Sequence, residues 1–177
     1  FARLGAIEAG RLGISMAVFS ALLSVGMSWV NAKLPEFAAY VSRGERGRLN
    51  ALFIVVLKRS VSFTIMAILA IIVITILLIR LDVAAVQRFA TLSVVFSLAV
   101  ITLCNCLIFA AAAYMRAHKE EPMMWVSVTT GLATLLAAAI GSLYGVETMM
   151  ALCALINAFM TLPWTAILFW RYYRRPV

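Results

Sequence analysis

The sequence predicts an all-α, polytopic integral membrane protein with about five transmembrane helices. Of the 177 residues, 65% are hydrophobic and only 12% are charged. A soluble domain of this size is about half apolar and about a quarter charged, and it has too little interior to bury such an excess. The mean hydropathy of +1.05 agrees with this. A soluble globular enzyme and a disordered chain are therefore both excluded.

Five stretches without any charged residue approach or exceed the roughly 20 residues that a helix needs to cross the hydrocarbon core. They are Leu12–Ala32, Ser60–Ile79, Phe89–Met115, Pro122–Val146 and Thr148–Trp170. The second stretch is rich in β-branched residues. In lipid, however, it must still be helical, because every backbone polar group needs a partner within the segment.

The ends of the first two helices have local causes. Pro35 lacks an N–H, so it should end or kink the first helix near Lys33. Residues 43–48 are basic and rich in glycine, which predicts a loop. An apolar run resumes at Leu49, so we expect the second helix to start before Ser60 or to lie partly in the membrane interface.

The third to fifth helices are connected by short segments. Pro122 suits the first turn of the fourth helix, because a helix start does not need its missing N–H. The turn between the fourth and fifth helices should contain Gly141 and Gly145, which have a small-xxx-small spacing. Aromatic residues gather where we expect the membrane interfaces, as in a belt of anchors. They are Trp125, Trp164, Trp170, Tyr172 and Tyr173.

The basic residues predict how the helices are oriented. Eleven of the 15 Lys and Arg residues lie on one side of the five spans and four lie on the other. The majority comprises Lys33, Arg43, Arg46, Arg48, Lys58, Arg59, Arg116, Lys119, Arg171, Arg174 and Arg175. Because cytoplasmic loops carry the basic excess, we expect the C-terminus in the cytoplasm and residue 1 outside. The net charge of +8 therefore reflects topology, and we expect no nucleic-acid partner.

Catalytic and metal-binding signatures are missing from the sequence. Cys104 and Cys106 lie on different faces of a helix, and Cys153 is in another span. The single histidine, His118, falls in a loop. The acidic pair Glu120–Glu121 fits a helix start, where it favours the helix dipole. We therefore expect no enzyme activity, no metal and no cofactor.

The most informative charged residues are Glu8 and Arg11, three residues apart and so on one face of the first helix. Ionisable side chains at membrane depth are costly and usually face a cavity or a partner. An arginine facing a water-filled cleft can bind a phosphate through two parallel hydrogen bonds. In the alternative, both residues lie at the outer interface and Arg11 extends to the lipid headgroups.

Four polar residues within the spans complete the candidates for lining a substrate cavity: Ser24, Asn31, Asn105 and Asn157. Ser24 and Asn31 belong to a stripe on the first helix that also contains Ser20 and Ser28. Such a stripe can line a pathway, and it can equally be a close helix contact, because small residues let helices approach in lipid. The two other asparagines are more often hydrogen-bond partners between helices.

Two stretches resemble a known family. Residues 29–53 read Trp-Val-Asn-Ala-Lys-Leu-Pro-Glu-Phe, then an amphipathic run, then a Gly-acidic turn and Leu-Asn-Ala-Leu-Phe. Residues 114–122, Tyr-Met-Arg-Ala-His-Lys-Glu-Glu-Pro, are similar to that family's inner loop before its next-to-last helix. The chain resembles the polysaccharide (O-antigen) flippases of the multidrug/oligosaccharidyl-lipid/polysaccharide exporter superfamily.

The resemblance implies that the five helices form most of one bundle in a two-bundle transporter. The chain starts at Phe1 rather than Met, so we expect it to be the C-terminal part of a longer protein whose N-terminal half is its partner. The implied substrate is a lipid-linked oligosaccharide on undecaprenyl pyrophosphate, moved across the bacterial cytoplasmic (inner) membrane by alternating access. Arg11 is best suited to bind the pyrophosphate.

Three other functions stay open from the sequence. A multidrug or small-molecule exporter of the same superfamily would use acidic or aromatic groups to hold cations. A membrane-embedded glycosyl or phosphoglycosyl transferase would need acidic residues to hold a divalent ion with phosphate. A membrane scaffold would transport nothing.

Overall fold

Helices make up all the regular secondary structure in the computed structural model, which describes residues 5–81, 89–118 and 122–174. The elements are α1 (Ala6–Ala32), α2 (Leu34–Ser42), α3 (Arg46–Arg80), α4 (Leu92–Arg116), α5 (Met124–Gly141), α6 (Val146–Ile156), the π-helical turn η2 (Asn157–Thr161) and α7 (Leu162–Arg174). Within the described ranges, five helical stretches are long and apolar enough to cross a membrane. The prediction of an all-α polytopic membrane protein is confirmed.

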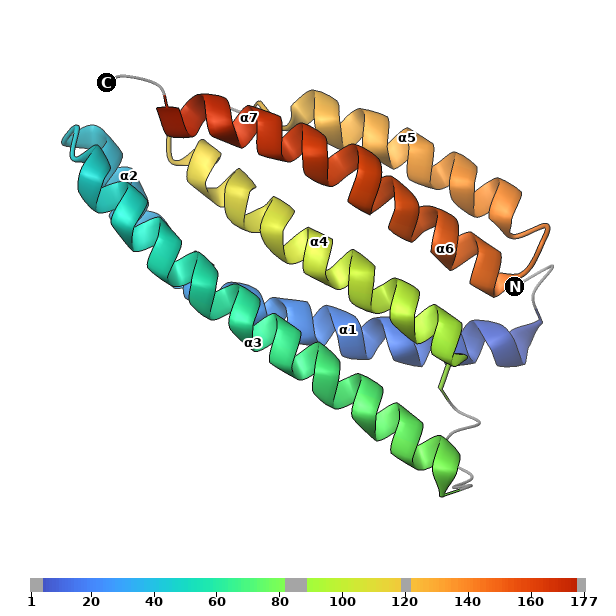
Figure 1. The fold of residues 1–177 in the computed structure, drawn as a ribbon. Coiled ribbons are helices and arrows are strands. Elements are labelled where there is room, and N and C mark those ends of the chain that lie inside the picture. Colours follow the sequence, from blue (N-terminus) through green and yellow to red (C-terminus); the bar gives the residue numbers. More distant parts are fainter. Residues whose placement is uncertain (1–4, 82–88, 119–121, 175–177) are drawn as a thin grey trace.

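The central helix of the bundle is α4, which packs against α1, α3, α6 and α7 (Figure 1). Its sequence explains this position, because Ala110, Ala112 and Ala113 let neighbouring helices approach closely. The antiparallel pair α5 and α6 packs together, and α2 lies against α3. Glu120 and Glu121, which we expected at the start of the fourth helix, lie outside the described residues, as do Lys119, Arg175 and the segment 82–88.

The break between α1 and α2 falls at Lys33, where Pro35 predicts it. Gly44 then turns the chain with φ = 71°, a value that glycine adopts without strain. The predicted loop over residues 43–48 is too long, because α3 already begins at Arg46 and includes Gly47. Tertiary contacts override the weak helix propensity of that glycine, since Leu49 in the first turn is fully buried.

A buried polar layer joins α1, α3 and α4 in the middle of the bundle. The Ser60 hydroxyl donates a hydrogen bond of 2.6 Å to the carbonyl oxygen of Gly26 and lies 3.3 Å from the Cys106 sulfur. The hydroxyl of Thr64 donates to the backbone of Ser60 at 2.8 Å and lies 3.5 Å from the same sulfur. This contact is possible because Gly26 has no side chain. Cys104 packs in a separate cluster against α7, so the two thiols do face different neighbours.

An aromatic cluster joins α3, α4 and α7 at the end of the bundle near α2. Tyr114, which is 1% exposed, lies with ring centroids 4.9 Å from Phe53 and 5.2 Å from Phe169. Its hydroxyl donates a hydrogen bond of 2.6 Å to Asn50 Oδ1. Burying a hydroxyl is favourable only with such a partner. Tyr173 also joins the cluster, and Arg174 lies over the ring of Trp170 at 4.5 Å.

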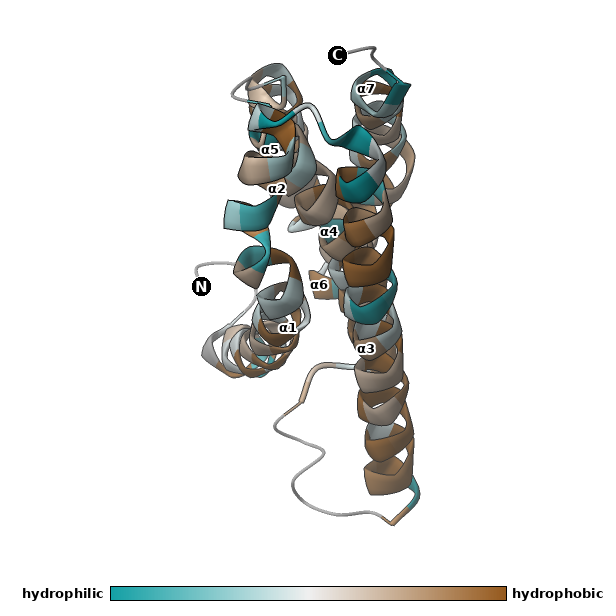
Figure 2. Cartoon of the chain, turned by 90° about the vertical axis from the view of Figure 1, so that its left-hand side faces the viewer, coloured by the Kyte–Doolittle hydropathy of each residue, from teal (hydrophilic) through white to brown (hydrophobic). Residues whose placement is uncertain are grey.

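Outside these contacts the helices expose apolar side chains, as a lipid-facing surface requires. The long helix α3 is predominantly hydrophobic along its length (Figure 2). Met66, Leu69 and Ile74 are each more than half exposed there. Soluble monomers rarely expose apolar surface of this extent, and it agrees with a bundle solvated by acyl chains.

Candidate functional site

Arg11 lies in the second turn of α1, at the end of the bundle where α4 and α6 begin. It is partly buried, and it lines two cavities that lie on either side of it. Both cavities are near the ends of helices, so a position in a cavity and a position near the membrane interface are compatible for Arg11. We call these the α3-side and the α6-side cavity.

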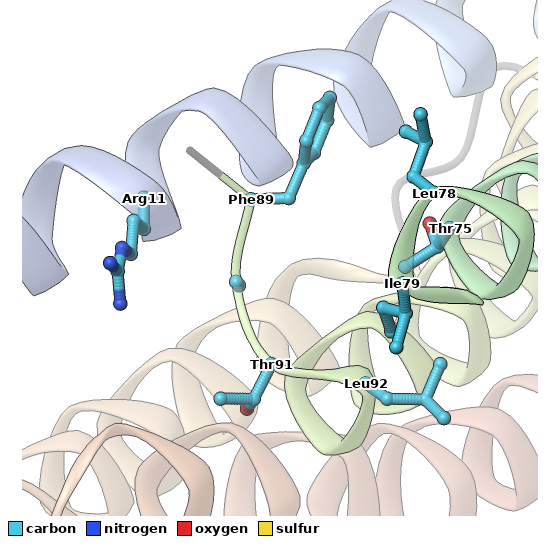
Figure 3. A pocket seen from close by; sticks show the side chains of 8 residues that line it. Arg11, Thr75, Leu78, Ile79, Phe89, Thr91 and Leu92 are labelled. Carbon is cyan, nitrogen blue, oxygen red and sulfur yellow. The ribbon is translucent and has the colours of Figure 1, made fainter. Parts of the chain in front are cut away.

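The α3-side cavity has a volume of about 260 Å³. Its far wall is formed by Thr75, Leu78 and Ile79 of α3, and the segment 89–92 before and at the start of α4 completes it. Figure 3 shows Phe89 standing between Arg11 and the α3 side chains. Arg11 is the charged one among the described residues that line this cavity, and most of the others are apolar.

The α6-side cavity, of about 320 Å³, is more polar. Glu8 and Glu147 line it together with Arg11, and the exposed ring of Tyr144 lies beside them. The carboxylate of Glu147 accepts a hydrogen bond of 2.7 Å from the Thr91 hydroxyl. The structure thus brings Glu8 and Arg11 together, as their spacing predicts, and adds a second carboxylate from a distant part of the chain.

The guanidinium of Arg11 has a donor without an acceptor. Its Nε is buried and has no hydrogen-bond partner among the described residues. The two ion pairs in the described ranges, Lys33–Glu36 and Arg48–Glu45, lie elsewhere. A buried donor left unsatisfied costs about 1–3 kcal/mol, and more when the group is charged. An acceptor at this position, such as a phosphate oxygen, would remove that cost.

The chain segment beside Arg11 is held by two hydrogen bonds. The fully buried Ser15 accepts a bond of 3.1 Å from the backbone N–H of Ala90, one turn along α1 from Arg11. The bond from Thr91 to Glu147 fastens the same segment to the start of α6. Together they fix the wall that separates the two cavities.

The other sequence-predicted candidates lie away from Arg11. Ser24 is exposed and its hydroxyl donates to the Ser20 carbonyl at 2.9 Å. Asn31 lines a cavity at the other end of α1. Asn105, partly buried in α4, and Asn157, whose amide donates to the Cys153 carbonyl at 3.0 Å, line neither cavity at Arg11. The structure thus does not gather the six candidates into one site.

Sequence reasoning missed Ser15, Thr91 and Glu147 as neighbours of Arg11. Ser15 and Ala90 are 75 residues apart, and Thr91 and Glu147 are 56 apart. Spacing within one helix cannot reveal such pairs. The only local signal is that each of the three is polar and adjoins the end of an apolar run.

In the part of the chain that the structure describes, no three His, Cys, Asp or Glu side chains lie close enough to hold a metal ion. Comparison with known proteins adds no identification. No family model, no curated protein and no solved structure matches this chain.

Proposed function

We propose that this chain is part of a membrane transporter that moves a phosphate-bearing amphiphile, a lipid-linked oligosaccharide, across the bacterial cytoplasmic membrane. The observation that carries the proposal is the buried, unpartnered Nε of Arg11 beside a largely apolar cavity. A pyrophosphate oxygen is a fitting acceptor for a guanidinium, and the charge-assisted bond is about twice as strong as a neutral one. The resemblance of residues 29–53 and 114–122 to polysaccharide flippases supports the same function.

The mechanism that this function requires is alternating access between two bundles. The five helices would contribute most of one bundle, and a preceding N-terminal half would supply the other. Arg11 would hold the phosphate at the outer end while the saccharide passes, and the apolar surface of the helices would face the lipid carrier. The basic excess near α2, α3 and the end of α7 supports a cytoplasmic location for that end and for the C-terminus.

A second candidate function is export of an organic cation. Glu8 and Glu147 both line the α6-side cavity, and the exposed ring of Tyr144 lies beside them. Two carboxylates and an aromatic face attract a cation, whereas they repel a pyrophosphate. The two candidates therefore differ in which cavity at Arg11 is used.

Complementation of a bacterial strain that lacks its own polysaccharide flippase tests the proposal. The native protein should restore surface polysaccharide, and Arg11→Ala should lower this restoration at least about tenfold, because a charged hydrogen bond is worth about 1.5–3 kcal/mol. Arg11→Lys should retain part of the activity, since lysine keeps the charge but cannot form bidentate hydrogen bonds to the phosphate.

Arg80→Ala is the matched control, because Arg80 is exposed at the end of α3, on the same side as Arg11 by the charge count. It should transport normally. Normal polysaccharide with Arg11→Ala would refute the role of Arg11. Suppose instead that the native protein does not restore surface polysaccharide and exports a fluorescent organic cation. If this export depends on Glu147, the second candidate function replaces the first.

A further inference from the structure

A third cavity lies at the opposite end of the contact between α1 and α4, next to the start of α2. We call it the α2-end cavity. With a volume of about 510 Å³, it is the largest of the three discussed. Met27, Leu34, Phe109 and Ala113 give it apolar walls. Two polar residues, Asn31 of α1 and Arg116 of α4, also line it.

The charge of the α2-end cavity favours an anion. Arg116 brings a guanidinium, Asn31 brings an amide that donates two hydrogens, and none of the described residues that line the cavity carries a carboxylate. The nearest acid along α2, Glu36, is already paired with Lys33. The α6-side cavity at the other end, by contrast, has Glu8 and Glu147 beside its arginine.

The apolar part of the cavity indicates what the anion is attached to. Phe109 is 45% exposed and Leu34 is 37% exposed, so apolar surface continues from the cavity onto the outside of the bundle. A free phosphate would gain nothing from these side chains. In a bilayer an acyl chain packs along such side chains by van der Waals contact, because lipid tails and apolar side chains are equally apolar.

We propose that the α2-end cavity binds an anionic phospholipid of the membrane leaflet near α2. The phosphate contacts the guanidinium of Arg116 and the amide of Asn31, and one acyl chain lies along Phe109 and Leu34. Such a lipid fills a cavity that residues of α1, α2 and α4 line together. This site does not depend on the proposed transport function, because it involves neither Arg11 nor its cavities.

Native mass spectrometry of the purified protein, released from detergent with equal amounts of phosphatidylglycerol and phosphatidylcholine, tests the site. The native protein should retain phosphatidylglycerol in preference to phosphatidylcholine. Arg116→Ala should lower the retained phosphatidylglycerol about tenfold, which corresponds to about 1.4 kcal/mol. Asn31→Asp should lower it as well, because the new carboxylate repels the phosphate.

Arg59→Ala is the control, since Arg59 is exposed on α3 and lines none of the cavities described above. It should bind lipid as the native protein does. If Arg116→Ala does not fold, as judged by size-exclusion chromatography, Asn31→Asp decides the question. The proposal is overturned if neither variant changes lipid retention, if phosphatidylcholine binds equally well, or if millimolar inorganic phosphate displaces the lipid.

Discussion

Gly26 determines how closely α1 approaches α3. A Cβ at this position would lie 2.6 Å from the Thr64 hydroxyl oxygen, and real Cβ atoms do not come so near. Thr64 has little freedom to retreat, because its hydroxyl is bonded to the Ser60 backbone and the side chain is fully buried. Each hydrogen bond of this layer is worth only about 0.6 kcal/mol in a membrane bundle, so steric fit is the larger effect.

We therefore expect Gly26→Ala to destabilise the protein by about 1–3 kcal/mol, the usual cost of overpacking a well-filled interior. The measurement is the thermal unfolding midpoint of the purified protein in detergent. Gly131→Ala in α5 is the matched control, because a Cβ there meets nothing within 4 Å. It should leave the midpoint unchanged or raise it slightly, since alanine is the better helix former. Equal midpoints for Gly26→Ala and the native protein would contradict the steric argument.

At the level of residues, the sequence is a partial guide. A charge inside an apolar run is conspicuous, and Glu8 and Arg11 do line one cavity. The bond between Ser60 and Gly26 spans 34 residues, and nothing in the pattern of serines distinguishes Ser60 from the exposed Ser24. Whether a small polar residue is buried depends on which helix lies opposite, and one sequence does not contain that information.

The π-helical turn η2 interrupts the last transmembrane helix. The N–H of Leu162 donates to the carbonyl of Asn157, five residues earlier, instead of the usual four. The cause is local, because Pro163 has no N–H and its ring would clash with the carbonyl four residues before it. The turn also directs Thr161 toward α5, where its hydroxyl lies 3.2 Å from that of Thr130.

Replacing Pro163 by alanine should let this helix close up into regular α geometry. We expect hydrogen–deuterium exchange of the peptide covering residues 157–168 to slow about tenfold, since one gained backbone bond is worth about 1 kcal/mol or somewhat more. Pro35→Ala is the control, because Pro35 occupies the first turn of α2, where no hydrogen bond is lost. Unchanged exchange in Pro163→Ala would mean that the contact with Thr130, rather than the proline, holds the π turn.

At the level of elements, a proline predicted a helix break correctly, whereas a glycine predicted a loop where the chain is helical. Pro35 correctly marks the break between α1 and α2. Gly47, expected in a loop, is helical because packing outweighs its low propensity. Pro163 lies within a stretch that reads as one continuous span, and the sequence does not distinguish a kink, a break and a π turn at such a position.

For the whole molecule, the number of spans followed from composition and run length alone. Lipid permits few structures, so five uncharged runs predict five helices, and the described residues contain them. The packing of the other helices around α4 could not be predicted from the sequence, because all five runs are similarly apolar. The abundance of small residues in α4 is the one feature that favours a central position.

The charge count makes a prediction about the orientation of the whole molecule. In Ser42→Cys the new thiol is exposed at the last residue of α2, and in Tyr144→Cys it is exposed between α5 and α6. We expect a membrane-impermeant maleimide to label Tyr144→Cys on intact spheroplasts and Ser42→Cys only after permeabilisation, because the basic side faces the cytoplasm. The opposite pattern would invert the topology and place Arg11 on the cytoplasmic side.

The burial of all three native thiols has a practical consequence for such work. Cys104, Cys106 and Cys153 are each at most 9% exposed. Since only a thiol that reaches water reacts with a charged reagent, the native protein should not be labelled by the maleimide. Distance measurements between α1 and α3, or between α5 and α7, can therefore begin with the natural sequence, without first removing cysteines from the polar layer at Ser60.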